Sequence, residues 1–111
     1  MDINYRNEKL KKQCTSLKDA KRAFDAITAK NLFRKINFIE AADNLQSVIN
    51  YPPFHFHDLK GERSGTYAMD VNGRNNSYRI ICSFDAPKTH VFSEASTITI
   101  MEIEEVSNHY E

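Results

Sequence analysis

The sequence predicts an α+β fold in which amino-terminal helices pack on a small antiparallel sheet of about four strands. In the first half of the chain, apolar residues recur at steps of three and four, which is the spacing of one helix face. In the second half they recur at steps of two, which is typical of strands. The consecutive prolines Pro52 and Pro53 separate the two halves, because they favour extended backbone and cannot continue a helix.

Size and composition indicate a single domain over residues 1–111. A chain of 111 residues with 41% hydrophobic and 27% charged residues matches an ordinary globular protein. Its apolar runs fall short of the roughly 20 residues that a membrane helix needs. Its start also lacks the apolar region of a secretory signal. We therefore expect a cytoplasmic protein.

The first half is expected to contain a short strand over residues 2–6 and two lysine-rich helices over 7–15 and 16–24. Ser16 followed by Asp19 resembles a helix start, because a serine side chain can accept a hydrogen bond from the first turn. A third and clearest helix is predicted over 27–42, with an apolar stripe made of Ala29, Leu32, Ile36 and Ile39. This stripe is expected to pack on the sheet.

The second half is expected to contain a hairpin and a central strand. Apolar residues alternate with other residues over 67–71 and 78–84, which predicts two paired strands. Their connection contains Asn72-Gly73, a pair that tolerates positive φ. After a polar loop over 85–95, the strand predicted over 97–106 carries β-branched residues on both faces of its first half. This pattern indicates a central strand rather than an edge strand.

Charge is unevenly distributed, although the net charge is zero. Residues 1–37 carry ten Lys or Arg and four Asp or Glu, whereas residues 38–111 carry five and eleven. The basic third could bind phosphates or simply form the solvated faces of helices, and charge alone leaves both interpretations open. Cys14 and Cys82 are expected to be free thiols, since two separated cysteines indicate neither a disulfide framework nor a metal site.

Histidines and an arginine are the first candidates for chemistry. His55 and His57 alternate along an extended segment, so both imidazoles can face the same way. No third ligand follows at metal-site spacing, and we expect no bound metal. Arg79 alternates with the core residues of its strand, which predicts a place on the open face of the sheet. There it would meet a substrate anion or form a salt bridge with Asp70 or a nearby Glu, and spacing leaves both open.

Several short motifs carry a family resemblance when they are taken together. In chain order they are His57-Asp58-Leu59-Lys60-Gly61, Arg63, Gly65, Tyr67, Tyr78-Arg79-Ile80 and Val106-Ser107-Asn108-His109. The combination resembles the HigB-like branch of the RelE/ParE superfamily, the toxins of type II toxin-antitoxin pairs. The resemblance extends over nearly the whole chain. It implies a compact fold with helices packed against a small antiparallel sheet, which agrees with the layout predicted above.

The resemblance implies a ribosome-dependent mRNA endonuclease that inhibits translation without a metal or other cofactor. Its partners would be a cognate helix-turn-helix antitoxin of the HigA type, the ribosome and mRNA, with no membrane. The residues carried over as catalytic are His57, Lys60, Arg79 and His109. Histidines would take the proton from a ribose 2′-OH and give one to the leaving 5′-oxygen, while Lys60 and Arg79 would hold the charge of the phosphorane. Which histidine is the acid stays open.

RNA contacts are expected from Arg63, Arg74 and Tyr110. The family's usual Asp-Tyr-His ending appears here as Ser107-Asn108-His109, and Tyr110 could replace the missing ring. Three other interpretations stay open: a non-nuclease binding protein that inhibits DNA gyrase, a degenerate toxin that binds only its antitoxin, and an unrelated single-domain protein with no catalytic site. The four candidate catalytic residues favour cleavage, whereas the altered ending favours degeneration.

Overall fold

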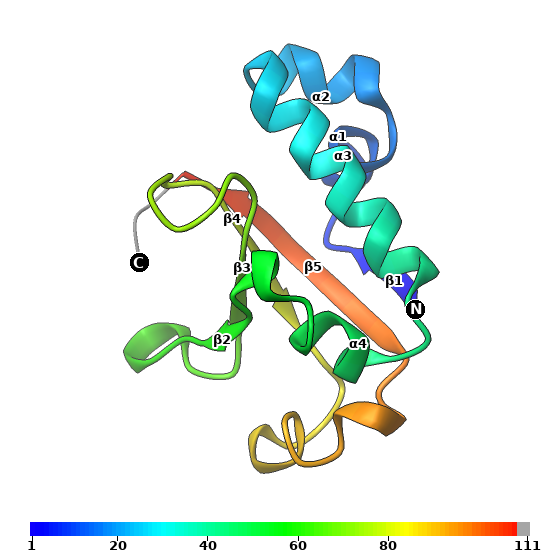
Figure 1. The fold of residues 1–111 in the computed structure, drawn as a ribbon, viewed down its shortest axis with the longest axis vertical. Helices are drawn as coiled ribbons and strands as arrows, with labels where there is room; N and C mark the ends of the chain where they lie inside the picture. Colours follow the sequence, from blue (N-terminus) through cyan, green and yellow to red (C-terminus); the bar gives the residue numbers. More distant parts are fainter. Residues whose placement is uncertain (109–111) are drawn as a thin grey trace.

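The structure is a computed structural model that describes residues 1–108, with a five-stranded sheet in the order β1-β5-β4-β3-β2 (Figure 1). The elements in chain order are β1 (Asp2–Tyr5), α1 (Glu8–Thr15), α2 (Leu17–Ala23), α3 (Ala26–Ala41), α4 (Leu45–Ile49), η1 (Pro52–Phe54), β2 (His57–Asp58), η2 (Gly61–Arg63), β3 (Tyr67–Asp70), β4 (Arg79–Ser83), η3 (Lys88–His90), η4 (Ala95–Thr97) and β5 (Ile100–Ser107). The predicted α+β fold is confirmed.

The sheet differs from the prediction at its edges. β1 runs parallel to β5, whereas the other neighbouring strands are antiparallel, and the sheet has five strands rather than about four. β5 lies between β1 and β4, so its predicted central position is confirmed. It begins at Ile100, because residues 95–97 form η4 instead of the start of a strand. The short helix α4 was not predicted.

Side-chain caps explain where the helices begin. Within residues 1–108, each α-helix follows a residue whose side chain accepts a hydrogen bond from a main-chain N–H of the first turn. The pairs are Asn7 with Leu10, Ser16 with Asp19, Asp25 with Thr28, and Asn44 with Ser47. The predicted helix start at Ser16 is therefore confirmed.

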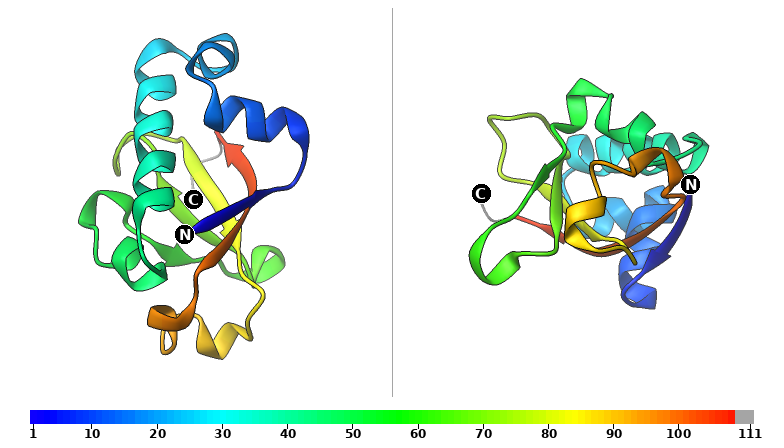
Figure 2. Two further views of the ribbon diagram at one scale, coloured as in Figure 1. Left: turned by 90° about the vertical axis from the view of Figure 1, so that its right-hand side faces the viewer. Right: turned by 90° about the horizontal axis from the view of Figure 1, so that it is seen from below.

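The helices pack on one face of the sheet and bury the main core there (Figure 2). The predicted stripe of α3 is fully buried. The core joins α1, α3 and α4 to the sheet through Leu10, Cys14, Leu32, Ile36, Ile39, Leu45, Val48, Tyr67, Met69, Ile80, Cys82, Met101 and Ile103. Within residues 1–108, no helix is both long enough and apolar enough to cross a membrane.

The opposite face of the sheet positions the candidate site. It carries a smaller apolar cluster of Leu59, Ala68 and Ile81. Alternate residues of a strand point to opposite faces, so Asp70 and Arg79 also belong to this side. We call the sheet side defined by these five residues the second face.

Candidate functional site

Two neighbouring rows of paired residues cross the second face. The first row is His57 on β2, Ala68 on β3, Ile81 on β4 and Glu105 on β5. The second row is Asp70 on β3, Arg79 on β4 and Ser107 on β5. Directly paired residues of neighbouring strands point to the same face. Strand rise and spacing place the Cα atoms of His57 and Arg79 roughly 12 Å apart.

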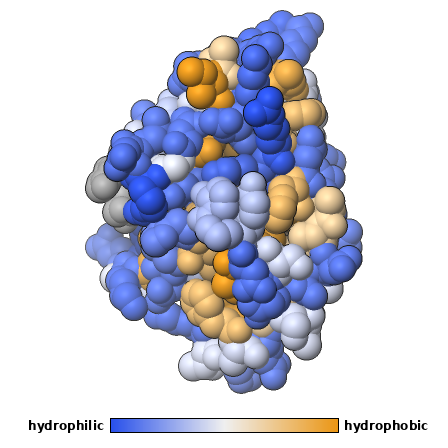
Figure 3. All heavy atoms as spheres, in the orientation of Figure 1, coloured by the Kyte–Doolittle hydropathy of each residue, from blue (hydrophilic) through white to orange (hydrophobic). Residues whose placement is uncertain are grey.

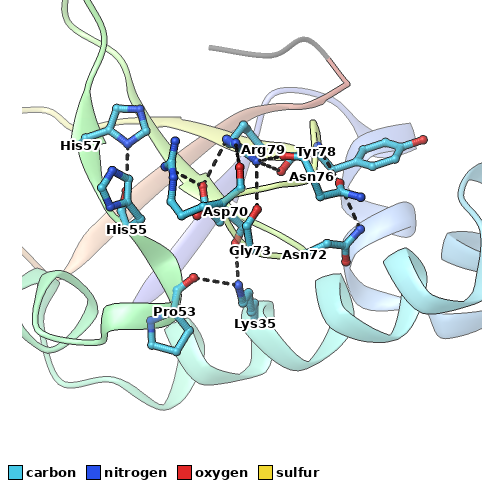
Figure 4. Close-up of polar contacts among 11 residues, drawn as sticks. Lys35, Pro53, His55, His57, Asp70, Asn72, Gly73, Asn76, Tyr78 and Arg79 are labelled. Carbon is cyan, nitrogen blue, oxygen red and sulfur yellow. Dashed lines mark hydrogen bonds and ion pairs between the residues drawn. The ribbon is translucent and has the colours of Figure 1, made fainter.

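The main chain of His55 holds the imidazole of His57. His57 Nδ1 lies 2.8 Å from the carbonyl oxygen of His55, and the two rings lie 5.1 Å apart (Figure 4). Nothing within residues 1–108 forms a hydrogen bond with the other ring nitrogen, Nε2. His55 has a φ of 43° and a ψ of 51°, a left-handed backbone conformation that is uncommon outside glycine. The imidazole of His57, at the edge of the sheet, is therefore partly exposed, and its Nδ1 is held by the His55 carbonyl.

Arg79 and Asp70 form a buried ion pair. Arg79 Nε lies 3.1 Å from Asp70 Oδ1, and the two side chains are 0% and 1% exposed. Arg74 Nη1 also lies 3.1 Å from this oxygen, and the Arg74 side chain is 42% exposed. The Asp70 carboxylate thus contacts one guanidinium inside the protein and another at its surface.

The guanidinium of Arg79 also orders the loop between β3 and β4. It donates to the carbonyl oxygens of Gly73 (3.5 Å), Arg74 (3.3 Å), Asn76 (2.5 Å) and Tyr78 (2.9 Å) (Figure 4). Lys35 on α3 donates to the main-chain oxygen of Asp70 at 2.7 Å and to that of Pro53 at 3.1 Å. Burial and the charge of Arg79 lower the pKa of Lys35, against the opposite effect of Asp70. The end of β3, where this loop begins, is thereby connected to α3.

These contacts correct the prediction for Arg79. Alternation places it on the side of the sheet away from the core, as expected, but its guanidinium is buried rather than open to a substrate anion. The alternative prediction of a salt bridge with Asp70 is confirmed. Because its donors face Asp70 and the loop carbonyls, Arg79 orders the loop rather than presenting its charge to solvent.

Lys60 lies on the other side of β2 from His57. Leu59 packs in the apolar cluster of the second face. Alternation in β2 therefore directs Asp58 to the opposite side, and Lys60, just beyond the strand, pairs with Asp58 there. Lys60 Nζ lies 3.2 Å from Asp58 Oδ2, and its side chain is 84% exposed. The hydrogen bond from Lys60 lowers the pKa of Asp58. The structure thus does not bring Lys60 and His57 to one surface.

The other cations proposed to contact RNA also have acidic partners. Arg63 Nη2 pairs with Glu105 Oε1 across η2 and β5, and Arg74 pairs with Asp70. Exposed ion pairs are weak, so a phosphate could compete for Lys60 or for the exposed part of Arg74.

The predicted site also includes residues at the carboxyl terminus. His109 and Tyr110 lie outside the described residues. The preceding Asn108 accepts a hydrogen bond from the Ser77 hydroxyl at 2.5 Å. The end of β5 therefore lies beside the loop that Arg79 orders.

Sequence reasoning missed Lys88 and Lys35. Lys88 Nζ donates to Ser64 Oγ at 2.6 Å, and its charge contributes to the lowered pKa of Asp58. Lys88 stands alone in a polar loop, and Lys35 lies on a helix far away in sequence. Neither position carries a pattern that could have predicted these contacts.

Three cavities of the described chain lie away from the predicted site residues. Cavities of about 510, 470 and 360 Å³ are lined by other residues and include none of the predicted site residues. The face of the molecule seen in Figure 3 is mostly hydrophilic. Among the 108 residues that the structure describes, no group of three or more His, Cys, Asp or Glu could hold a metal ion.

Comparison with known proteins gives one family and one fold. The HigB-like toxin family, described as the RelE-like toxin of the type II toxin-antitoxin system HigB, matches residues 4–94. A solved YoeB/ParE toxin from Agrobacterium tumefaciens is similar in fold, with a TM-score of 0.50 and 13% identity over 99% of this chain and 100% of that chain. Curated protein sequences give no match. The chain therefore belongs to the HigB-like family of RelE-like toxins of type II toxin-antitoxin systems.

Proposed function

We propose that the chain is a metal-independent, ribosome-dependent mRNA endonuclease that inhibits translation in the cytoplasm. The observation that carries the proposal is the partly exposed imidazole of His57, with Nδ1 engaged by the main chain. An imidazole is suited to take the proton from a ribose 2′-OH when RNA is cleaved without a metal. A type II toxin has an antitoxin partner, and we propose that this partner is a HigA-like helix-turn-helix protein. The whole chain would act as one toxin domain.

In the proposed reaction, one histidine removes the 2′-OH proton and the 2′-oxygen forms a bond to the adjacent phosphorus. The bond from phosphorus to the 5′-oxygen then breaks, and a second histidine supplies the proton that this oxygen takes up. His57 and His109 are the proposed pair, and His109 lies outside the described residues. The products are a 2′,3′-cyclic phosphate and a 5′-hydroxyl.

The cations have different proposed tasks. Lys60 and the exposed parts of Arg63 and Arg74 would exchange their carboxylate partners for RNA phosphates. Tyr110 would stack on a base. Arg79 would act as a positioning residue, because its buried guanidinium orders the loop that carries Arg74.

The helical layer supports contact with the ribosome. Residues 1–37 hold ten Lys or Arg against four Asp or Glu. The lysines of α1 and α2 that are exposed are Lys9, Lys11, Lys12, Lys18 and Lys21. Cations on such a surface gain affinity for RNA by releasing condensed counterions. The basic helical layer is therefore the part of the chain that we propose to contact ribosomal RNA.

A second candidate function keeps the fold without cleavage: inhibition of DNA gyrase, or binding to the antitoxin alone. It is favoured by the carboxylate partners of Lys60, Arg63 and Arg74 and by the burial of Arg79. A protein with these functions would not need the engaged imidazole of His57.

Induced expression with mapping of mRNA 5′ ends tests the proposal. Wild-type protein is expected to arrest growth and to produce new cuts inside translated messages, whereas His57→Gln is expected to abolish both. His90→Gln is the matched control, because His90 is exposed and lines the cavity of about 510 Å³, which contains none of the predicted site residues. Far-UV circular dichroism of both purified variants verifies folding.

The other outcomes separate the alternatives. Growth arrest without new cuts would reject the nuclease and favour gyrase or another target. Absence of arrest with a folded, antitoxin-binding protein would favour a degenerate toxin. Cleavage that survives in His57→Gln would reject the assigned site.

A further inference from the structure

We infer that the main-chain carbonyl of His55 fixes the tautomer of His57 and so makes Nε2 of His57 the base in RNA cleavage. The inference rests on the proposed nuclease function for its catalytic consequence. Its structural part, the tautomer, can be measured without any cleavage. His55 is thus assigned as a positioning residue that acts through His57.

The tautomer follows from the chemistry of the contact. A carbonyl oxygen only accepts hydrogen bonds, and it lies 2.8 Å from His57 Nδ1. The contact is therefore a hydrogen bond when Nδ1 carries the proton, and a repulsion between two lone pairs when it does not. A neutral imidazole holds one ring proton, so Nε2 is left with a lone pair.

The backbone at His55 is shaped for this contact. Among the non-glycine residues of the described chain, His55 alone has a positive φ. Left-handed backbone is unfavourable for side chains with a Cβ and persists where the surroundings stabilise it, commonly at functional sites. The ψ angle of a residue directs its own carbonyl, and the ψ of 51° at His55 turns that oxygen toward His57.

Packing on both sides holds this conformation. The His55 N–H donates to the Pro52 carbonyl at 3.0 Å, which closes η1. Phe54, the residue before, is fully buried. Phe56, the residue after, stacks on Tyr67 with ring centroids 5.4 Å apart and an interplanar angle of 9°. The carbonyl is therefore fixed between two anchored aromatic side chains.

The position of the ring proton decides which of the two histidines is the base and which is the acid in the proposed reaction. With Nδ1 protonated, Nε2 of neutral His57 can accept the 2′-OH proton, and the hydrogen bond to His55 is kept before and after the transfer. The ring does not need to rotate during the reaction. The proton for the leaving 5′-oxygen then falls to His109. A neutral imidazole in the other tautomer would present an N–H to the 2′-oxygen and could not act as a base.

The first experiment measures the tautomer by NMR. Long-range proton–nitrogen correlation spectra of uniformly ¹⁵N-labelled protein distinguish protonated from unprotonated ring nitrogens. Spectra recorded at about pH 8.5, above the ordinary imidazole pKa of about 6.5, report neutral rings. The chain has four histidines, and comparison with His57→Gln assigns the signals of His57. We expect protonated Nδ1 and unprotonated Nε2; the opposite pattern would overturn the inference.

Two substitutions at His55 separate the role of its carbonyl from that of its side chain. Glycine adopts left-handed backbone freely and keeps the carbonyl, whereas a β-branched valine disfavours that conformation. His55→Gly is expected to keep the Nδ1–H tautomer, and His55→Val is expected to lose it while retaining the native circular dichroism spectrum. Loss of the tautomer in His55→Gly, or its retention in folded His55→Val, would contradict the role of the backbone.

Cleavage assays on translating ribosomes then test the consequence. His55→Val is expected to cleave more slowly than His55→Gly, by less than the roughly 10²–10⁴-fold effect of removing a general base. Equal rates despite different tautomers would overturn the assignment of Nε2 as the base. No cleavage by wild-type protein that shows the expected tautomer would reject the proposed nuclease, and with it the catalytic role, while upholding the structural part.

Discussion

Replacing Arg79 by methionine is expected to destabilise the fold by about 3–5 kcal/mol. Methionine keeps a long side chain but removes the charge that faces Asp70 at 3.1 Å. It also removes the donors that bind four carbonyl oxygens in the β3–β4 loop. Both losses occur where the side chain is 0% exposed, so water cannot replace the guanidinium without reorganisation of the loop.

The magnitude follows from the burial of the pair. Removing one partner of a buried ion pair costs about 3–5 kcal/mol, because the other charge remains poorly solvated. Arg74 stays 3.1 Å from Asp70, but its side chain is 42% exposed and compensates only in part. A domain of 111 residues is typically stable by roughly 5–15 kcal/mol. The substitution would therefore remove about a fifth of the stability or more.

Urea unfolding followed by far-UV circular dichroism measures this loss, since the chain contains no tryptophan. The matched control is Arg22→Met. The Arg22 side chain is 69% exposed, and its contact with Asp19 spans 3.9 Å. The control is expected to change the free energy of unfolding by at most about 0.5 kcal/mol.

A loss below about 1 kcal/mol for Arg79→Met would refute the reasoning. The double variant Asp70→Leu/Arg79→Met gives an independent check, because a buried pair replaced by apolar groups often costs little. We expect it to be less destabilised than the sum of the single variants Asp70→Leu and Arg79→Met by about 1–3 kcal/mol. Additivity within about 0.5 kcal/mol would mean that the two side chains do not interact.

Two other groups give predictions that depend on pH and on burial. The main-chain N–H and the hydroxyl of Thr28 lower the pKa of Asp25 at the start of α3. The ionised Asp25 side chain therefore stabilises the folded protein at pH values above the ordinary Asp pKa of about 3.9. This stabilisation is lost as the pH falls through the lower pKa of the folded state. The difference in unfolding free energy between wild type and Asp25→Asn should be constant above about pH 5 and change below it; a constant difference down to about pH 2 would contradict this. Burial raises the pKa of Cys14 to about 12, so an aromatic disulfide reagent should modify it slowly in native protein and rapidly in urea. Equal modification rates in native protein and in urea would mean that the packing of α1 does not shield the Cys14 thiol.

The fold could be predicted where elements are long enough to show their period. The stripe of α3 and the alternation in β3 and β4 needed several repeats each, and all three elements are present. β2 has two residues and α4 has five, so neither completes a recognisable pattern. The parallel pairing of β1 depends on chain direction after three helices, which local periodicity does not report.

The sequence indicated which residues to consider for the site, but not their burial or their contacts. Alternation gave the face on which Arg79 lies, but its burial depends on the path of the β3–β4 loop, including a φ of 93° at Gly73. The contact of His57 depends on left-handed backbone at His55, a position without the glycine or asparagine that usually indicates it. The acidic partner of Arg63 lies 42 residues away on another strand. Such contacts arise from tertiary packing rather than from local sequence.

Loss of toxicity has different physical meanings at His57 and at Arg79. His57 is partly exposed and contributes one main-chain contact, so its replacement should leave the fold intact and affect proton transfer alone. Arg79 is buried in a network that supports the loop bearing Arg74, so its replacement lowers stability and displaces neighbouring cations together. An Arg79 variant that fails to arrest growth therefore implicates the guanidinium in chemistry only if the unfolding free energy is retained. Because the structure predicts that it is not, His57 is the residue at which a loss of cleavage identifies the site.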